Sequence, residues 1–255
     1  MAVVAIVSAK GGCGASLVAT NLAVHLARRA PTLLLDLHPV LGYDDLLLDL
    51  RPDRSWLDLI PVAAELTARH IELTAAVHSS GLRFLAAPRT SRPTLASEPQ
   101  IGALLASLAG WHAWLLLDLA PETILAGPDW LAQLELLLLV ATGDPPALRG
   151  ARVLLEAFPA EMRAHARLVL NQFGRRHPVQ PRAVADTLKC PLLAVLPTDR
   201  SAVGYQVNFG HPCALDPSSA FGRAVASLAR HLTSDESSQG EPGAALPAAE
   251  AAGAK

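Results

Sequence analysis

The stretch SAKGGCGAS, residues 8–16, holds Gly11, Gly12 and Gly14 between two apolar segments. AVVAIV, residues 2–7, precedes it with the composition of a buried strand, and LVATNLAVHLARRA, residues 17–30, follows with that of a helix. A glycine turn from a strand into a helix lets backbone N–H groups approach an anion at the positive helix end. The stretch therefore predicts a phosphate-binding loop, although a tight packing turn needs glycine for the same reason.

The loop lacks the lysine that ordinarily stands directly before its serine. The usual pattern, G-x-x-x-x-G-K-[ST], fails at Ala9 and Ala15, so Lys10 is the remaining cation. The Ser16 hydroxyl can still hydrogen-bond a phosphate or ligate Mg²⁺. A charge-assisted hydrogen bond contributes about 1.5–3 kcal/mol, so we expect nucleotide affinity to be lower by roughly one to two decades. Hydrolysis should suffer more, because electrostatic stabilisation is the main tool of phosphoryl transfer.

Away from the loop, short apolar runs recur along the chain with helix-like segments between them. None of the runs alternates apolar with polar residues, which is typical of strands buried on both faces. The runs are 3–8, 32–37, 82–87, 114–119, 135–141, 166–171 and 192–197, and the helical segments are 16–30, 98–110, 146–158, 181–188 and 218–232. This alternation predicts an α/β fold, with a mostly parallel sheet of about seven strands and helices on both faces.

Composition excludes several classes of protein. The 255 residues carry a net charge of −2, which gives no sign of a nucleic-acid-binding surface. Cys13, Cys190 and Cys213 lack metal-type spacing and are expected to be reduced thiols of a cytoplasmic protein. No run reaches the roughly 18 apolar residues of a membrane span, and no signal peptide is recognisable. Residues 234–255 are poor in large apolar side chains and predict a disordered tail after one domain of residues 1–233.

Polar residues stand at the ends of three predicted strands. Asp36 and Asp118 each end an apolar run, and Asn171 ends another. Ligands of open α/β sheets sit at the carboxyl ends of strands, and Mg²⁺ prefers oxygen ligands. A helix cap or turn is the other interpretation of each residue taken alone. Beside a glycine loop, the two aspartates favour a Mg²⁺ site, with Asp118 as the stronger candidate.

Further polar residues near these strand ends have two interpretations each. His38 could accept a proton, since the reference pKa of histidine is about 6.5, but an exposed loop histidine without a catalytic part is favoured. Asp44 and Asp45 could supply a carboxylate, although we favour a solvated pair at a helix start. The basic stretch RRH, residues 175–177, could touch DNA phosphates, but a solvated loop fits the slightly negative net charge better.

Several blocks in chain order resemble the ParA/MinD family of deviant Walker A ATPases. They are KGGCGASLVATNLAVHLA from Lys10, LLLDLHPVLGYDDLLLDLRPDRSWLDLI from residue 33, LLLDLAP from residue 115, LVLNQF from residue 168 and LPTDRSAVGYQVNFGHP from residue 196. Within the family they resemble the CpaE/TadZ-like branch of Flp (Tad) pilus assembly, where the missing lysine is common. The resemblance implies a SIMIBI-type P-loop NTPase from residue 3 to about 232. A receiver-like domain, frequent in that branch, is not expected because a strand begins at once.

The resemblance also implies roles for individual residues. Nucleotide binding falls to Lys10, Gly11, Gly12, Cys13, Gly14, Ala15, Ser16, Asn171, Pro197 and Asp199, with the last three around the adenine. Mg²⁺ binding falls to Ser16, Asp36 and Asp118, and the catalytic positions are Lys10, Asp36 and His38. Lys10 would reach across a dimer interface to the partner's nucleotide. His38 departs from the family, which usually has a second aspartate there to orient the attacking water.

These implications predict a protein that binds ATP and Mg²⁺, forms an ATP-dependent homodimer and hydrolyses ATP weakly or not at all. It would act as a localisation or scaffold protein for pilus or secretion-system assembly. Its place would be polar or membrane-peripheral through partners, without membrane insertion and without DNA. Two alternatives stay open: an active ATPase that positions DNA or the division site, and a degenerate interaction module that binds no nucleotide.

Overall fold

An eight-stranded, mostly parallel sheet runs through the described part of the chain. The structure is a computed structural model that describes residues 2–38, 42–89, 96–174 and 177–235. The strands lie in the order β3-β4-β2-β5-β1-β6-β7-β8. They are β1 Ala2–Ser8, β2 Thr32–Asp36, β3 Ala76–Val77, β4 Arg83–Leu85, β5 Trp114–Leu119, β6 Leu136–Ala141, β7 Ala166–Leu170 and β8 Leu192–Val195. Neighbouring strands are parallel except for β3 and β4, which are antiparallel.

The central strands are buried as their continuous apolar sequences predict. Every side chain of β2 and β5 is buried, and only the first residue of β6 is not. A parallel sheet requires this, because helices cover both of its faces. The predicted α/β class is confirmed, and strands form at all seven predicted places. The eighth strand, β3, has two residues, which is too short to leave a pattern in the sequence.

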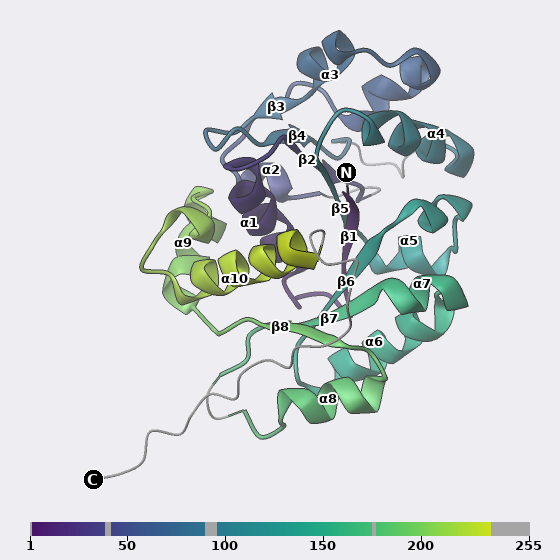
Figure 1. Ribbon diagram of the computed structural model, residues 1–255. Helices are drawn as coiled ribbons and strands as arrows, with labels where there is room; N and C mark the ends of the chain where they lie inside the picture. Colours follow the sequence, from purple (N-terminus) through teal and green to yellow (C-terminus); the bar gives the residue numbers. More distant parts are fainter. Residues whose placement is uncertain (1, 39–41, 90–95, 175–176, 236–255) are drawn as a thin grey trace.

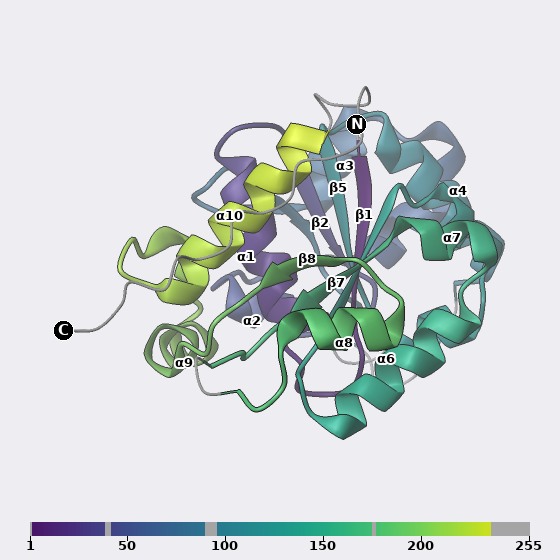
Figure 2. The ribbon, with the colours of Figure 1, turned by 60° about the horizontal axis from the view of Figure 1, so that its bottom comes forward.

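Helices cover the two faces of the sheet (Figure 1 and Figure 2). In both views α1 and α10 lie together on one face, while α4, α6 and α7 lie on the other. The α-helices are α1 Ala15–Ala27, α2 Asp44–Leu47, α3 Ala68–Thr74, α4 Glu98–Ala109, α5 Pro121–Leu125, α6 Pro145–Ala157, α7 Ala160–His165, α8 Pro181–Leu188, α9 Arg200–Phe209 and α10 Ala220–Asp235. Short 3₁₀ segments are η1 Trp56–Glu65, η2 Asp129–Gln133 and η3 Cys213–Leu215. None of the described helices has the length and apolar character needed to cross a bilayer.

Two of the expected helices differ from the sequence-based expectation by more than one residue at an end. Helix α1 ends at Ala27 with Arg28 as its C-cap, three residues before the expected end. Helix α10 continues to Asp235, so the expected domain boundary at residue 233 falls inside its last turn. Residues 236–255 lie outside the described residues, and the disordered tail stays a prediction.

The position of β1 creates the crevice where a ligand can bind. The chain passes from β1 through α1 to β2 on one side of the sheet, whereas it returns from β5 to β6 on the other side of β1. At such a switch in strand order, the loops at the carboxyl ends diverge and leave a crevice. The glycine loop after β1, Asp36 at the end of β2 and Asp118 near the end of β5 therefore share one edge of the sheet.

Candidate functional site

The glycine loop has a backbone that only glycine adopts without strain at two positions. Gly12 has φ 84° and Gly14 has φ 87°, both in the left-handed region. A Cβ on Gly14 would also lie 2.6 Å from Nδ2 of Asn171. Gly14 is the N-cap of α1, and no side chain caps this helix end. The first N–H groups of α1 are therefore left for a ligand, at the positive end of a 13-residue helix.

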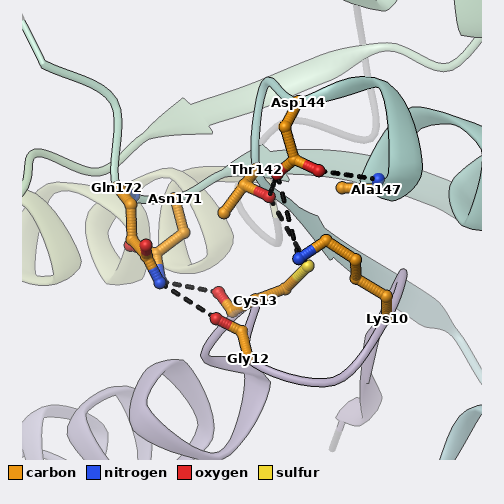
Figure 3. A network of polar contacts seen from close by, with 8 residues as sticks. All are labelled: Lys10, Gly12, Cys13, Thr142, Asp144, Ala147, Asn171 and Gln172. Carbon is orange, nitrogen blue, oxygen red and sulfur yellow. Dashed lines mark hydrogen bonds and ion pairs between the residues drawn. The ribbon is translucent and has the colours of Figure 1, made fainter.

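Side chains from the end of β7 hold the loop in place (Figure 3). Asn171 donates from Nδ2 to the carbonyl of Cys13 over 2.8 Å, and Gln172 donates from Nε2 to the carbonyl of Gly12 over 3.0 Å. The Cys13 thiol lies 3.8 Å from the Thr142 hydroxyl. Asn171 thus fixes the loop in this structure, whereas the sequence suggested contact with adenine or a place in a turn. Gln172 and Thr142 were not singled out, since nothing in their own segments marks them.

Lys10 is paired within its own chain. Its Nζ lies 3.9 Å from Oδ2 of Asp144, and both side chains are partly exposed. Asp144 also accepts a hydrogen bond from the Thr142 hydroxyl and one of 3.1 Å from the Ala147 N–H, which caps α6. The hydrogen bond from Thr142 is the main reason why the pKa of Asp144 lies below its usual value. Lys10 is therefore paired with an ionised carboxylate at the N-cap of α6.

Asp36, His38 and Asp118 meet at the carboxyl edge of β2 and β5, where Asp36 and Asp118 stand in register. Their ligand atoms lie within 4.8 Å of one another. His38 Nδ1 is 2.8 Å from Oδ1 of Asp36 and 3.7 Å from Oδ2 of Asp118. Burial alone would lower the pKa of His38, but the hydrogen bond to Asp36 and the charge of Asp118 raise it to about 9. His38 is thus charged at neutral pH and engaged with Asp36, not a free loop histidine.

The interpretation of Asp44 and Asp45 as a solvated pair is wrong. Both begin α2 as expected, but Asp44 has no exposed surface and Asp45 is only 8% exposed. Asp45 pairs with Arg89 over 2.6 Å, whereas the Asp44 carboxyl group lies against that of Asp118. Burial, followed by the charges of Asp118 and Asp36, raises the pKa of Asp44 well above its usual value. Tertiary packing buries this pair. The sequence of two aspartates at a helix start does not show that they will be buried.

The buried carboxylates fit a divalent cation. Neither oxygen of Asp118 accepts a hydrogen bond of normal geometry in the described chain. Burial raises the pKa of Asp118 to about 7, although the charge of His38 and the nearby Ser16 hydroxyl lower it in part. Buried carboxylate oxygens without donors are costly, and hard cations such as Mg²⁺ satisfy them. Ser16, Asp36 and Asp118 thus lie close together, and their assignment to Mg²⁺ stays a prediction.

The residues expected around the adenine lie further along the same edge. The Asp199 carboxylate accepts hydrogen bonds from within the chain. Its donors are the Ala202 N–H, the Ser219 hydroxyl and the Phe221 N–H, over 2.9–3.2 Å. It caps α9 and supports the start of α10. Pro197 is half-buried. Asp199 also lines an open pocket of about 480 Å³ that contains no residue of the glycine loop.

The basic stretch 175–177 is only partly visible. Arg175 and Arg176 lie outside the described residues. The ring of His177 stacks on Phe173 with centroids 4.0 Å apart, and its Nδ1 contacts the backbone of Val179. His177 therefore packs locally.

Comparison with known proteins places the fold. The sequence matches no protein-family model and no protein of curated function. A ParA family ATPase from Chlorobium tepidum has a TM-score of 0.80 at 22% identity, over 91% of this chain and 98% of that one. The septum site-determining protein MinD from Pyrococcus horikoshii, complexed with Mg-ADP, has a TM-score of 0.75 at 22% identity, over 91% and 95%. The cell division ATPase MinD from Pyrococcus furiosus has 0.72 at 25% identity, over 91% and 98%.

These similarities define the class of fold. The chain has the P-loop NTPase fold, with the arrangement of strands and helices found in ParA and MinD ATPases.

Proposed function

We propose that the chain binds ATP and Mg²⁺ at the glycine loop and forms a nucleotide-dependent homodimer with weak or no hydrolysis. In this proposal it is a localisation or scaffold protein of the CpaE/TadZ type, which places a pilus or secretion assembly. The resemblance of the ordered sequence blocks to that branch supports the biological role, and the geometry of the loop supports the nucleotide.

One observation carries the proposal: a glycine loop with two left-handed residues leads into the uncapped N-terminus of α1. Backbone N–H groups at such a helix end bind phosphate without any lysine. Ala15 supplies no charge, so these N–H groups, the helix dipole and a cation would hold the phosphates. Ser16, Asp36 and Asp118 would hold Mg²⁺, which would neutralise phosphate charge. The neighbour bound to Mg-ADP supports this assignment.

Weak hydrolysis follows from two residues. Ala15 removes the cation that would stabilise charge at the transferring phosphoryl group. His38, with a pKa raised to about 9, is already protonated at neutral pH and hydrogen-bonded to Asp36, so it is a poor acceptor for the proton of a water. Lys10 is the cation that remains for the nucleotide of a partner subunit. It must first leave Asp144, which costs little because exposed ion pairs contribute about 0–1 kcal/mol.

Calorimetry with ATP and Mg²⁺, together with light scattering, tests the proposal. We expect saturable binding of one nucleotide per chain and a doubling of mass when ATP is present. Phosphate release should stay close to background. The proposal is contradicted if the protein binds no ATP, or if its molecular mass in solution is the same with and without ATP.

An active ATPase that positions DNA or the division site is the second candidate. The MinD and ParA ATPases among the structural neighbours favour it. Phosphate release well above background that Asp118→Ala abolishes would select this candidate. DNA binding that weakens steeply as salt rises would assign it to DNA positioning.

A further inference from the structure

Asp44 lies next to Asp118 of the acidic cluster, although it comes from a different element. It is the first residue of α2, and it has no exposed surface. The chain reaches it past Gly42, where an added Cβ would lie 2.0 Å from Oδ2 of Asp36. The backbone before α2 is thus packed on one carboxylate, and the first turn of α2 places Asp44 within hydrogen-bonding reach of another, that of Asp118.

The Asp44 side chain has no structural task that explains its burial. Both of its oxygens are buried and accept no hydrogen bond among the described residues. It does not cap α2, because the N-cap is Tyr43 and no side chain caps that end. Its neighbour Asp45, in contrast, accepts from the Leu46 N–H and pairs with Arg89. A buried polar group without partners is rare in folded proteins, and a missing ion is one of its ordinary explanations.

No basic side chain of the described residues pairs with Asp44. Asp36, Asp44 and Asp118 bring three carboxyl groups to one edge of the sheet, and the basic groups nearby are engaged elsewhere. His38 is committed to Asp36 at 2.8 Å and is 3.7 Å from Asp118. Arg89 is committed to Asp45. The unpartnered oxygens of Asp44 and Asp118 are the hard ligands that a divalent cation prefers.

We propose that Asp44 supplies a third carboxylate to a divalent-cation site shared with Asp36 and Asp118, and that this site takes Mg²⁺ or Mn²⁺ without nucleotide. The inference deepens the proposed function, because it rests on the assignment of Asp36 and Asp118 to the cation. It does not require that ATP bind. The extra negative charge strengthens the hold on the cation at a site whose loop has Ala15 in place of a lysine.

Mn²⁺ binding to the nucleotide-free protein tests this inference. The loss of the free Mn²⁺ signal in electron paramagnetic resonance gives the affinity, and melting with and without Mn²⁺ gives a second readout. We expect one Mn²⁺ per chain in the wild type. Asp44→Asn should weaken Mn²⁺ binding by about tenfold or more, because a full charge beside the cation is lost. It should also shrink the rise in Tm that Mn²⁺ causes, since the variant lacks the carboxylate that the cation would satisfy.

Asp45→Asn is the matched control. It makes the same change of charge one residue away on the same helix, but its carboxylate faces Arg89, so Mn²⁺ affinity should stay within about twofold of the wild type. Asp44→Ser is a second variant and should show the same loss. Wild-type protein that binds no Mn²⁺, or Asp44 variants that bind it as the wild type does, would overturn the inference. If ATP and Mg²⁺ still bind in that case, the proposed function stands while this inference falls.

Discussion

Gly14 carries the strictest steric requirement in the loop. Its φ of 87° and the 2.6 Å approach of Asn171 to a Cβ both oppose any side chain. Gly14→Ala should lower the free energy of unfolding by about 1–2 kcal/mol, the ordinary cost of a left-handed non-glycine residue, and should remove ATP binding as the loop shifts. Urea titration and calorimetry measure the two effects.

Gly11→Ala is the control for that substitution. Gly11 has no atom within 4 Å of a Cβ position and no positive φ, so stability should change by less than about 0.5 kcal/mol. Equal losses in both variants would mean that the conformation of Gly14 is not what the loop needs.

A substitution at Ala15 tests how much ATP affinity the loop loses by lacking a lysine at this position. Ala15→Lys restores an ammonium at the first residue of α1, beside the uncapped helix end. ATP affinity should rise by about ten- to a hundredfold, which corresponds to one charge-assisted hydrogen bond. The comparison is made by calorimetry at fixed Mg²⁺. An unchanged or lower ATP affinity would show that the loop does not bind the phosphates of ATP in the way proposed.

His112 should make the free energy of unfolding depend on pH, and it does so away from the glycine loop and the acidic cluster. It is buried, and Arg83 lies 3.5 Å from its Nε2. Burial, followed by the charge of Arg83, lowers the pKa of His112 to about 4. The unfolded chain takes up this proton near pH 6.5 and the folded chain only near pH 4, so stability is lost as pH falls between these values.

His112→Gln removes this titration and keeps an acceptor for Arg83. The fall in unfolding free energy between pH 7 and pH 5 should shrink by about 1 kcal/mol, allowing for partial solvation. Urea midpoints at the two pH values give the result. An identical pH dependence in the variant would show that the ring is not held neutral.

At the scale of elements, Lys10 of the loop pairs with Asp144, the N-cap of α6, and the proposed dimer would have to rearrange this contact. Asp144→Asn keeps a cap for the Ala147 N–H and removes the charge that holds Lys10. We expect the ATP-dependent dimer to tighten by about two- to fivefold, in line with an exposed ion pair. Sedimentation at several concentrations measures this, with Lys10→Gln as the variant that should lose the dimer. A weaker dimer in Asp144→Asn would mean that Asp144 supports Lys10 instead of restraining it.

The elements differ in how far the sequence predicts them. Strands buried on both faces are read directly from apolar runs, because burial is uniform along them. The segment from α2 to α3 gave no clear pattern, since these short helices and η1 take their shape from packing on the sheet. The loop and the strand-end aspartates were predictable because their chemistry is local. Gln172 and Asp144 were not, and Asp44 was misjudged as solvated, because partners distant in the chain give these residues their surroundings.

At the scale of the whole molecule, the site depends on the meeting of separate strands at one edge. The loop follows β1, the carboxylates come from β2, β5 and α2, and Asn171 follows β7. The fold of the ParA and MinD ATPases accounts for this gathering. The described residues at that edge include one loop cation, one charged histidine and three buried carboxyl groups.

Calorimetric titration of the purified chain with ATP in the presence of Mg²⁺ tests most directly whether the loop holds a triphosphate without its lysine. The predicted result is a saturable curve with one ATP per chain in the wild type, lost in Gly14→Ala and retained in Gly11→Ala. The absence of binding heat up to millimolar ATP, or identical curves for the two glycine variants, would contradict the account.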